Sequence, residues 1–294
     1  MKDHDQPSPQ EHRWILDGLS YAGLAWGPVD GRPVLATHGW MDHAESFREL
    51  APRLAGCRVV ALDLSGQGHS AHRSPDATYN LWDDLPQMAT LIDTLGWETC
   101  TLIGHSRGAN INSLFAAAQP YRVNAVIALD ALVPDPVSEE AVVDTLRAFI
   151  EETRQQIARP RRSFTSKEDY VTRRSERRNS RQTAEALVDR AVAETPDGVR
   201  TRADARLFAS SAMKLTRPQV EAVLGALTMP VLNIWAKDGL PAYTEWPDTA
   251  RRLAGDLIAD YEAIDIPGDH HVHLDPDGAQ RIATAILDFL DRKA

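Results

Sequence analysis

The sequence of 294 residues contains little cysteine and no long hydrophobic run, and both absences exclude classes of protein. Its two cysteines, Cys57 and Cys100, are too few for a disulfide framework, and each lies in an apolar, strand-like segment where a thiol packs as a small hydrophobic side chain. The longest apolar runs, such as residues 59–64 and 125–129, are far shorter than the roughly 20 residues that a membrane-spanning helix needs. We therefore expect no membrane span and a reducing, cytoplasmic compartment.

The N-terminus also lacks the apolar centre of a secretory signal, and we expect residues 1–13 to form a loose tail. A formal net charge of −10 disfavours nucleic acid and anionic membrane surfaces unless positive charge gathers locally. Arginines do gather between residues 154 and 181, but Glu168, Asp169 and Glu176 interrupt them and aromatic residues are sparse. We expect a solvated, salt-bridged surface there and no nucleic-acid partner.

Short runs rich in valine, isoleucine and leucine alternate with segments of helical spacing, which is typical of a mainly parallel sheet with helices on both faces. The expected strands are a hairpin within residues 13–26 and runs at 34–37, 58–62, 99–103, 125–129, 231–235 and 261–266. The expected helices are residues 44–54, 79–95, 107–119 and 276–290. No strong strand occurs between residues 131 and 228, so we interpret this segment as a helical cap inserted after strand 6. Residues 1–130 and 229–294 then form the core.

The sharpest local motif is Gly-His-Ser-Arg-Gly at residues 104–108, where a strand passes directly into a helix. So tight a turn needs small residues two positions before and after its centre, hence Gly104 and Gly108. Ser106 is then lifted clear of the sheet at a helix N-terminus, where the helix dipole favours developing negative charge. The context favours a nucleophile elbow over an idle serine in a glycine-rich turn.

A neutral serine hydroxyl is a poor nucleophile, so Ser106 needs a general base. The segment Gly-Asp-His-His-Val-His at residues 268–273 follows the last expected strand, at the same edge of the sheet as Ser106. We assign the base to His270, directly after the turn, and keep His273 and His271 as alternatives. Three neighbouring histidines are also compatible with a metal, but the sequence has no second cluster with ligand spacing, so we expect none.

Such a base needs a carboxylate that fixes its tautomer, and two aspartates follow strands that end at this edge. Asp130 follows the strand at residues 125–129, and Asp238 follows the strand at residues 231–235. The residues alone leave both candidates open.

Acyl transfer also needs backbone N–H donors for the oxyanion. One donor is expected from Arg107, directly after Ser106. The other is expected from Trp40, in the loop after the strand at residues 34–37, where Gly39 allows the chain to turn.

A further motif, Gly66-x-Gly68-x-x-Ala71, loosely imitates a dinucleotide-binding fingerprint. That fingerprint must open a helix, whereas Arg-Ser-Pro-Asp at residues 73–76 continues a loop. We expect a structural turn there and no cofactor.

In order along the chain, the motifs H-G-W, D-x-S-G-x-G-x-S, G-H-S-R-G and P-G-D-H-H-V-H resemble those of the α/β-hydrolase superfamily. The stretches H-G-W-M-D-H-A-E-S-F, L-D-A-L and I-P-G-D-H-H-V-H-L are similar, more narrowly, to the serine hydrolase-like family. The resemblance implies an α/β-hydrolase fold, a Ser-acid-His triad, no cofactor and hydrolase activity. It favours Asp130, because strand 6 of this family ends in a Leu-Asp pair like residues 129–130. The spacing from Ser106 also resembles that of haloalkane dehalogenases with their acid there, whereas Asp238 lies where most α/β-hydrolases carry it.

We therefore expect a carboxylesterase-type enzyme that cleaves a small-molecule ester or related acyl substrate through an acyl-enzyme on Ser106. Hydrolysis of a C–C bond, a lactone or an amide uses overlapping parts, and a non-catalytic binding protein is the alternative from another class. The arginine-rich cap is compatible with an anionic leaving group, and the oligomeric state stays open. An apolar pocket is suggested by five aromatic residues: Trp40, Phe47, Phe149, Phe164 and Phe208.

Overall fold

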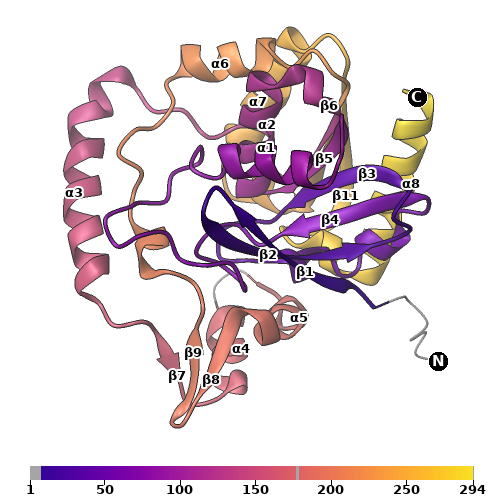
Figure 1. The fold of residues 1–294 in the computed structure, drawn as a ribbon. Helices are drawn as coiled ribbons and strands as arrows, with labels where there is room; N and C mark the ends of the chain where they lie inside the picture. Colours follow the sequence, from indigo (N-terminus) through magenta and orange to yellow (C-terminus); the bar gives the residue numbers. More distant parts are fainter. Residues whose placement is uncertain (1–7, 177–178, 294) are drawn as a thin grey trace.

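The computed structural model describes residues 8–176 and 179–293, and its centre is a twisted eight-stranded sheet (Figure 1). The strands of this sheet are β1 (Gln10–Leu16), β2 (Leu19–Trp26), β3 (Arg32–Thr37), β4 (Cys57–Leu62), β5 (Cys100–His105), β6 (Val123–Leu129), β10 (Val231–Asp238) and β11 (Tyr261–Asp269). They lie in the order β1-β2-β4-β3-β5-β6-β10-β11. From β4 to β11 all neighbours pair in parallel, whereas β1 and β2 form an antiparallel hairpin that joins β4. The predicted mainly parallel sheet and its leading hairpin are confirmed.

Both faces of the sheet are covered, because successive strand residues point to opposite sides. Along β3, Leu35 belongs to one buried core, and Val34 and Ala36 belong to the other. The first core is closed by α1 (Leu85–Thr94), α2 (Arg107–Ala118), α6 (Arg217–Gly225) and α7 (Trp246–Leu257). The second is closed by α8 (Pro276–Arg292) and by two short 3₁₀ turns, η1 (Ala44–Phe47) and η2 (Ala51–Arg53).

Three local expectations differ from the structure. The helix expected over residues 44–54 is instead the pair η1 and η2, because Pro52 has no N–H to continue a helix. Of the helix expected over residues 79–95, only Leu85–Thr94 is helical, since the Asp83 carboxylate accepts from Asn80 N at 2.6 Å and holds a turn before it. In the expected tail, residues 1–7 lie outside the described residues, and residues 10–13 belong to β1.

The inserted segment contains α3 (Val142–Ala158), α4 (Lys167–Ser175) and α5 (Arg181–Ala191), but it is not wholly helical. A small antiparallel sheet, in the order β7-β9-β8, is formed by β7 (Ser163–Phe164), β9 (Gly198–Thr201) and β8 (Val192–Thr195). Strands of two to four partly polar residues leave no apolar run in the sequence. Figure 1 shows α4, α5 and this sheet together, with α3 standing apart from them, whereas α6 packs on α2 and α7.

Buried polar contacts tie the insertion to the rest of the chain. Arg190 of α5 donates from Nε to Asp63 at 2.8 and 3.0 Å, and both side chains are almost fully buried. Asp204 accepts from Tyr79 at 3.0 Å and pairs with Arg206 and His72, at 2.7 and 3.1 Å. Within the described part of the chain, no helix is both long and apolar enough to cross a membrane.

Candidate active site

Ser106 occupies a one-residue turn, because β5 ends at His105 and α2 begins at Arg107. Its backbone, with φ of 52° and ψ of −117°, lies in a region that side chains with a Cβ atom rarely adopt, at a cost of roughly 1–3 kcal/mol. Two hydrogen bonds hold the turn: Ser106 N donates to Leu129 O, and Ala109 N donates to Ser106 O, each at 3.0 Å. This strained strand-to-helix geometry is that of a nucleophile elbow.

The glycines on either side permit this close approach of the chain. A Cβ atom on Gly104 would lie 2.5 Å from Cα of Ala109, and one on Gly108 would lie 2.1 Å from the carbonyl oxygen of Thr37. Both contacts are with backbone atoms, which cannot move aside as a flexible side chain can. The sharp turn at Ser106 therefore excludes any larger residue at either position.

His270 follows β11 and has a carboxylate directly beside it. Its Nδ1 lies 2.6 Å from Oδ2 of Asp130, which directly follows β6 and is only 2% exposed. The same carboxylate accepts from Ala236 N of β10 at 3.0 Å and from Leu240 N, just after β10, at 2.8 Å, so the end of β10 and the turn that follows it fix the carboxylate. Because an ionised carboxylate only accepts, Nδ1 of neutral His270 carries the hydrogen and Nε2 keeps its lone pair. That tautomer is the one a general base needs.

The structure does not bring Asp238 to His270. Asp238 is exposed at the end of β10, where its register partner is Asp269 of β11. The other two histidines have different partners: His271 Nε2 lies 3.1 Å from Asp42 Oδ2, and His273 Nε2 lies 2.9 Å from Ser46 Oγ.

Ser106 and His270 both line a cavity of about 360 Å³, within the range of small-molecule sites. Trp40 and Phe208 form part of its apolar wall, with their rings edge to face at 5.0 Å, and Trp40 Nε1 donates to Leu207 O at 2.9 Å. Phe164 also lines the cavity. Of the other two aromatic residues expected there, Phe47 is buried in the second core, and Phe149 is not among the described residues that line the cavity.

The loop after β3 and the start of α2 surround Ser106 at the cavity. Gly39 and Trp40 line it, and a Cβ atom on Gly39 would lie 2.9 Å from Nδ1 of His105. Arg107 is the first residue of α2, so its N–H lies in the first turn, where no helical carbonyl can accept it.

Three arginines of the insertion also line the cavity, although no motif singles them out: Arg162, Arg173 and Arg174. Arg174 reaches across to the loop after β3, where it donates from Nη1 to Met41 O at 2.9 Å and pairs through Nη2 with Asp42. These partners are more than a hundred residues away along the chain, so no local motif could reveal the contact.

The Asp63–Ser70 motif lies in a loop that is held by its own first residue. The Asp63 carboxylate accepts from Ala44 N at 2.7 Å and from His69 N at 2.8 Å, in addition to its pair with Arg190. The chain continues as a loop after this motif, and α1 begins only at Leu85.

Comparison with known proteins agrees with this fold and motif order. Residues 32–277 match the family model described as alpha/beta hydrolase fold. The chain is 31% identical to a serine hydrolase-like protein of Danio rerio, over 91% of this chain and 84% of that one. It is 28% identical to a serine hydrolase-like protein of Dictyostelium discoideum, over 94% and 80% of the two chains. The crystal structure of a hypothetical protein from Pseudomonas aeruginosa PAO1 superposes with a TM-score of 0.90 at 35% identity, covering 96% of this chain and 99% of that one.

The chain therefore belongs to the α/β-hydrolase superfamily and, within it, to the serine hydrolase-like family. This confirms the resemblance drawn from the four motifs and supports hydrolase activity on a small-molecule substrate.

Proposed function

We propose that this protein is a carboxylesterase-type serine hydrolase that forms an acyl-enzyme on Ser106. The observation that carries the proposal is the 2.6 Å contact between His270 Nδ1 and Asp130 Oδ2, together with a serine in a strained elbow that lines the same cavity as His270. A serine, a histidine in the correct tautomer and a buried acid are the parts that acyl transfer requires.

In the proposed reaction, Ser106 Oγ attacks the ester carbonyl carbon while its proton passes to Nε2 of His270. The Asp130 carboxylate stabilises the resulting imidazolium, and the N–H groups of Trp40 and Arg107 stabilise the oxyanion. When the tetrahedral intermediate collapses, His270 gives the proton to the departing alkoxide. A water molecule, deprotonated by His270, then attacks the acyl carbon and forms a second tetrahedral intermediate. When that intermediate collapses, the acid leaves, and His270 returns the proton to Ser106 Oγ.

The lining of the cavity indicates the substrate class. Trp40, Phe164 and Phe208 offer an apolar wall, and Arg162 brings a positive charge to the same space. The other two arginines there, Arg173 and Arg174, are paired with Asp169 and Asp42. We infer an ester with an apolar acyl group and an anionic substituent. The two buried, free cysteines are compatible with work in a reducing cytoplasmic compartment.

The test is hydrolysis of p-nitrophenyl acetate, butyrate and octanoate, and of a butyrate analogue that ends in a carboxylate, by the wild type and Ser106→Ala. The wild type is expected to turn over at least one ester, with a lower KM for the anionic analogue than for butyrate, and Ser106→Ala is expected to lose about 10⁴-fold or more in kcat. Turnover that survives in Ser106→Ala would contradict the proposal. No turnover of any ester would favour lactone, amide or C–C hydrolysis, or a binding role.

A further inference from the structure

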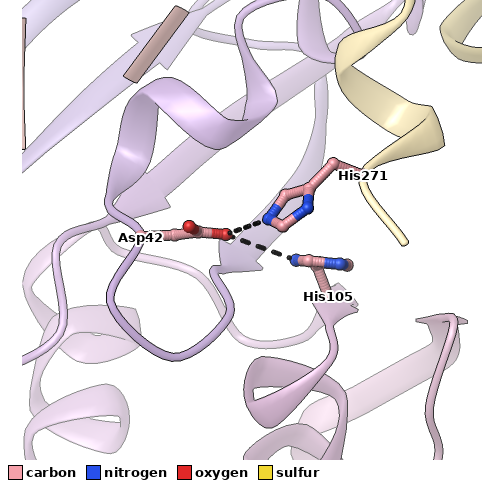
Figure 2. Close-up of side chains that lie close together, drawn as sticks. All are labelled: Asp42, His105 and His271. Carbon is pink, nitrogen blue, oxygen red and sulfur yellow. Dashed lines mark hydrogen bonds and ion pairs between the residues drawn. The ribbon is translucent and has the colours of Figure 1, made fainter. Parts of the chain in front are cut away.

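Beside the proposed triad, three buried side chains from separate segments of the chain lie close together (Figure 2). Asp42 comes from the loop after β3, His105 ends β5, and His271 follows β11. Asp42 Oδ2 lies 3.1 Å from His271 Nε2 and 3.6 Å from His105 Nδ1. These three atoms, each of which can be a metal ligand, all lie within 4.8 Å of one another. None of these side chains takes part in the hydrolysis proposed above.

The tautomer of His105 leaves one of its nitrogens without a donor. Its Nε2 lies 2.8 Å from the backbone carbonyl oxygen of His270, which can only accept, so Nε2 carries the hydrogen. In the neutral ring, Nδ1 therefore presents a lone pair toward the Asp42 carboxylate, which also only accepts. Among the residues that the structure describes, Nδ1 of His105 has no hydrogen-bond partner. A buried lone pair that faces a carboxylate is unfavourable unless a cation lies between them.

The same arrangement is typical of a histidine that ligates a metal, whose second ring nitrogen donates to a backbone carbonyl and thereby fixes the ring. Around a tetrahedral Zn²⁺ with ligands at about 2.0–2.2 Å, neighbouring donor atoms lie about 3.4 Å apart. The distances from Asp42 Oδ2, 3.1 and 3.6 Å, lie on either side of this value.

We propose that Asp42, His105 and His271 bind a divalent transition metal such as Zn²⁺. The ligands are Asp42 Oδ2, His105 Nδ1 and His271 Nε2. For His271 Nε2 to bind the metal, the hydrogen of the neutral ring must lie on Nδ1, which has no hydrogen-bond partner among the described residues. All three side chains line the cavity that contains Ser106, so a metal can reach them through that cavity.

The neighbours of the cluster leave this site open. Arg174 Nη2 pairs with Oδ1 of Asp42, so it leaves Oδ2 to the two histidines. Ser46 Oγ also lies 3.4 Å from Oδ2, and it bonds to His273 Nε2 at 2.9 Å. Carboxylate and imidazole ligands are those that Zn²⁺ and related metals accept.

Binding is tested in the Ser106→Ala background, so that the result does not depend on whether the chain hydrolyses esters. Tag-free protein is stripped with a chelator and titrated with ZnCl₂ by calorimetry. One equivalent of Zn²⁺ is expected to bind, and His271→Gln is expected to weaken the affinity at least about tenfold. The control, His69→Gln, changes a histidine outside the cluster that pairs with Glu11, and it should bind Zn²⁺ unchanged.

A crystal of the Ser106→Ala protein soaked in ZnCl₂ gives an independent test, even if His271→Gln fails to fold. An anomalous-scattering peak is expected between Asp42 Oδ2, His105 Nδ1 and His271 Nε2. No binding in solution, unchanged affinity in folded His271→Gln, or a peak elsewhere would overturn the proposed site.

Discussion

Replacing Asp130 with asparagine keeps the size of the side chain but removes its charge and one acceptor oxygen. In the structure, Oδ1 accepts from Ala236 N, while Oδ2 accepts from Leu240 N and contacts His270 Nδ1. The oxygen of an asparagine can still accept from Ala236. Its NH₂ group then faces the N–H of Leu240, which is also a donor. The NH₂ group can donate to His270 only if Nδ1 has no hydrogen, that is, if the ring hydrogen lies on Nε2.

In that altered tautomer the hydrogen of His270 sits on Nε2, so the ring cannot take the proton of Ser106. The expected loss in kcat is about 10⁴-fold, or about 5.5 kcal/mol, which is the effect of the same exchange in the Ser-His-Asp triad of a serine protease. The unpaired N–H of Leu240 is also expected to lower the free energy of unfolding by about 1–3 kcal/mol.

The assay measures kcat for the best p-nitrophenyl ester, with folding of each variant checked by circular dichroism. The matched control is Asp238→Asn, which makes the same chemical change at an exposed carboxylate and is expected to leave kcat within about twofold. If Asp130→Asn keeps most of its activity, or if Asp238→Asn loses it, the assignment of the acid is wrong.

Three further predictions concern stability and are read from urea unfolding. Arg190→Met leaves a buried carboxylate unpaired and should cost about 3–5 kcal/mol, whereas Arg181→Met, in an exposed ion pair, should cost less than about 1 kcal/mol. Equal losses would refute this reasoning. Burial raises the pKa of Asp204, but bonds from its histidine and arginine partners outweigh burial and hold the pKa well below its usual range. The stability that ionised Asp204 contributes is therefore present above about pH 4 and is lost as the pH falls further. Asp204→Asn should have a lower free energy of unfolding than the wild type at pH 7, and this difference should disappear in acid. A difference that does not change with pH would contradict this role of Asp204. Gly104→Ala should fail to fold or to react, while Gly225→Ala, with nothing within 4 Å of its added carbon, should be neutral or slightly stabilising.

The core of the fold was predictable because its signals are local. Parallel strands buried on both faces appear as apolar runs, and α8 shows an apolar face with Asp275 accepting from Gly278 N at its start. Helix α7 was not predicted, although Ala250, Leu253 and Ala254 recur at helical spacing and form part of its buried face.

The candidate site was predictable only in part, because only some of its residues lie in local motifs. Ser106 and His270 each lie in a motif whose shape follows from neighbouring residues. The residues alone left both Asp130 and Asp238 open, because both follow strands that end at the same edge, and only the family resemblance favoured Asp130. What distinguishes them is long-range: Asp130 accepts from two backbone N–H groups, Ala236 in β10 and Leu240 just after it. The Asp42 cluster brings together residues up to 229 positions apart in the sequence, and a local motif cannot predict contacts at that separation.

The most direct test of Ser106 as nucleophile is labelling of the intact protein by a fluorophosphonate, followed by mass spectrometry of its peptides. The account predicts one added phosphonyl group, located on Ser106, in the wild type and none in Ser106→Ala. An unlabelled wild type that is folded, or a label on any other residue, would contradict it.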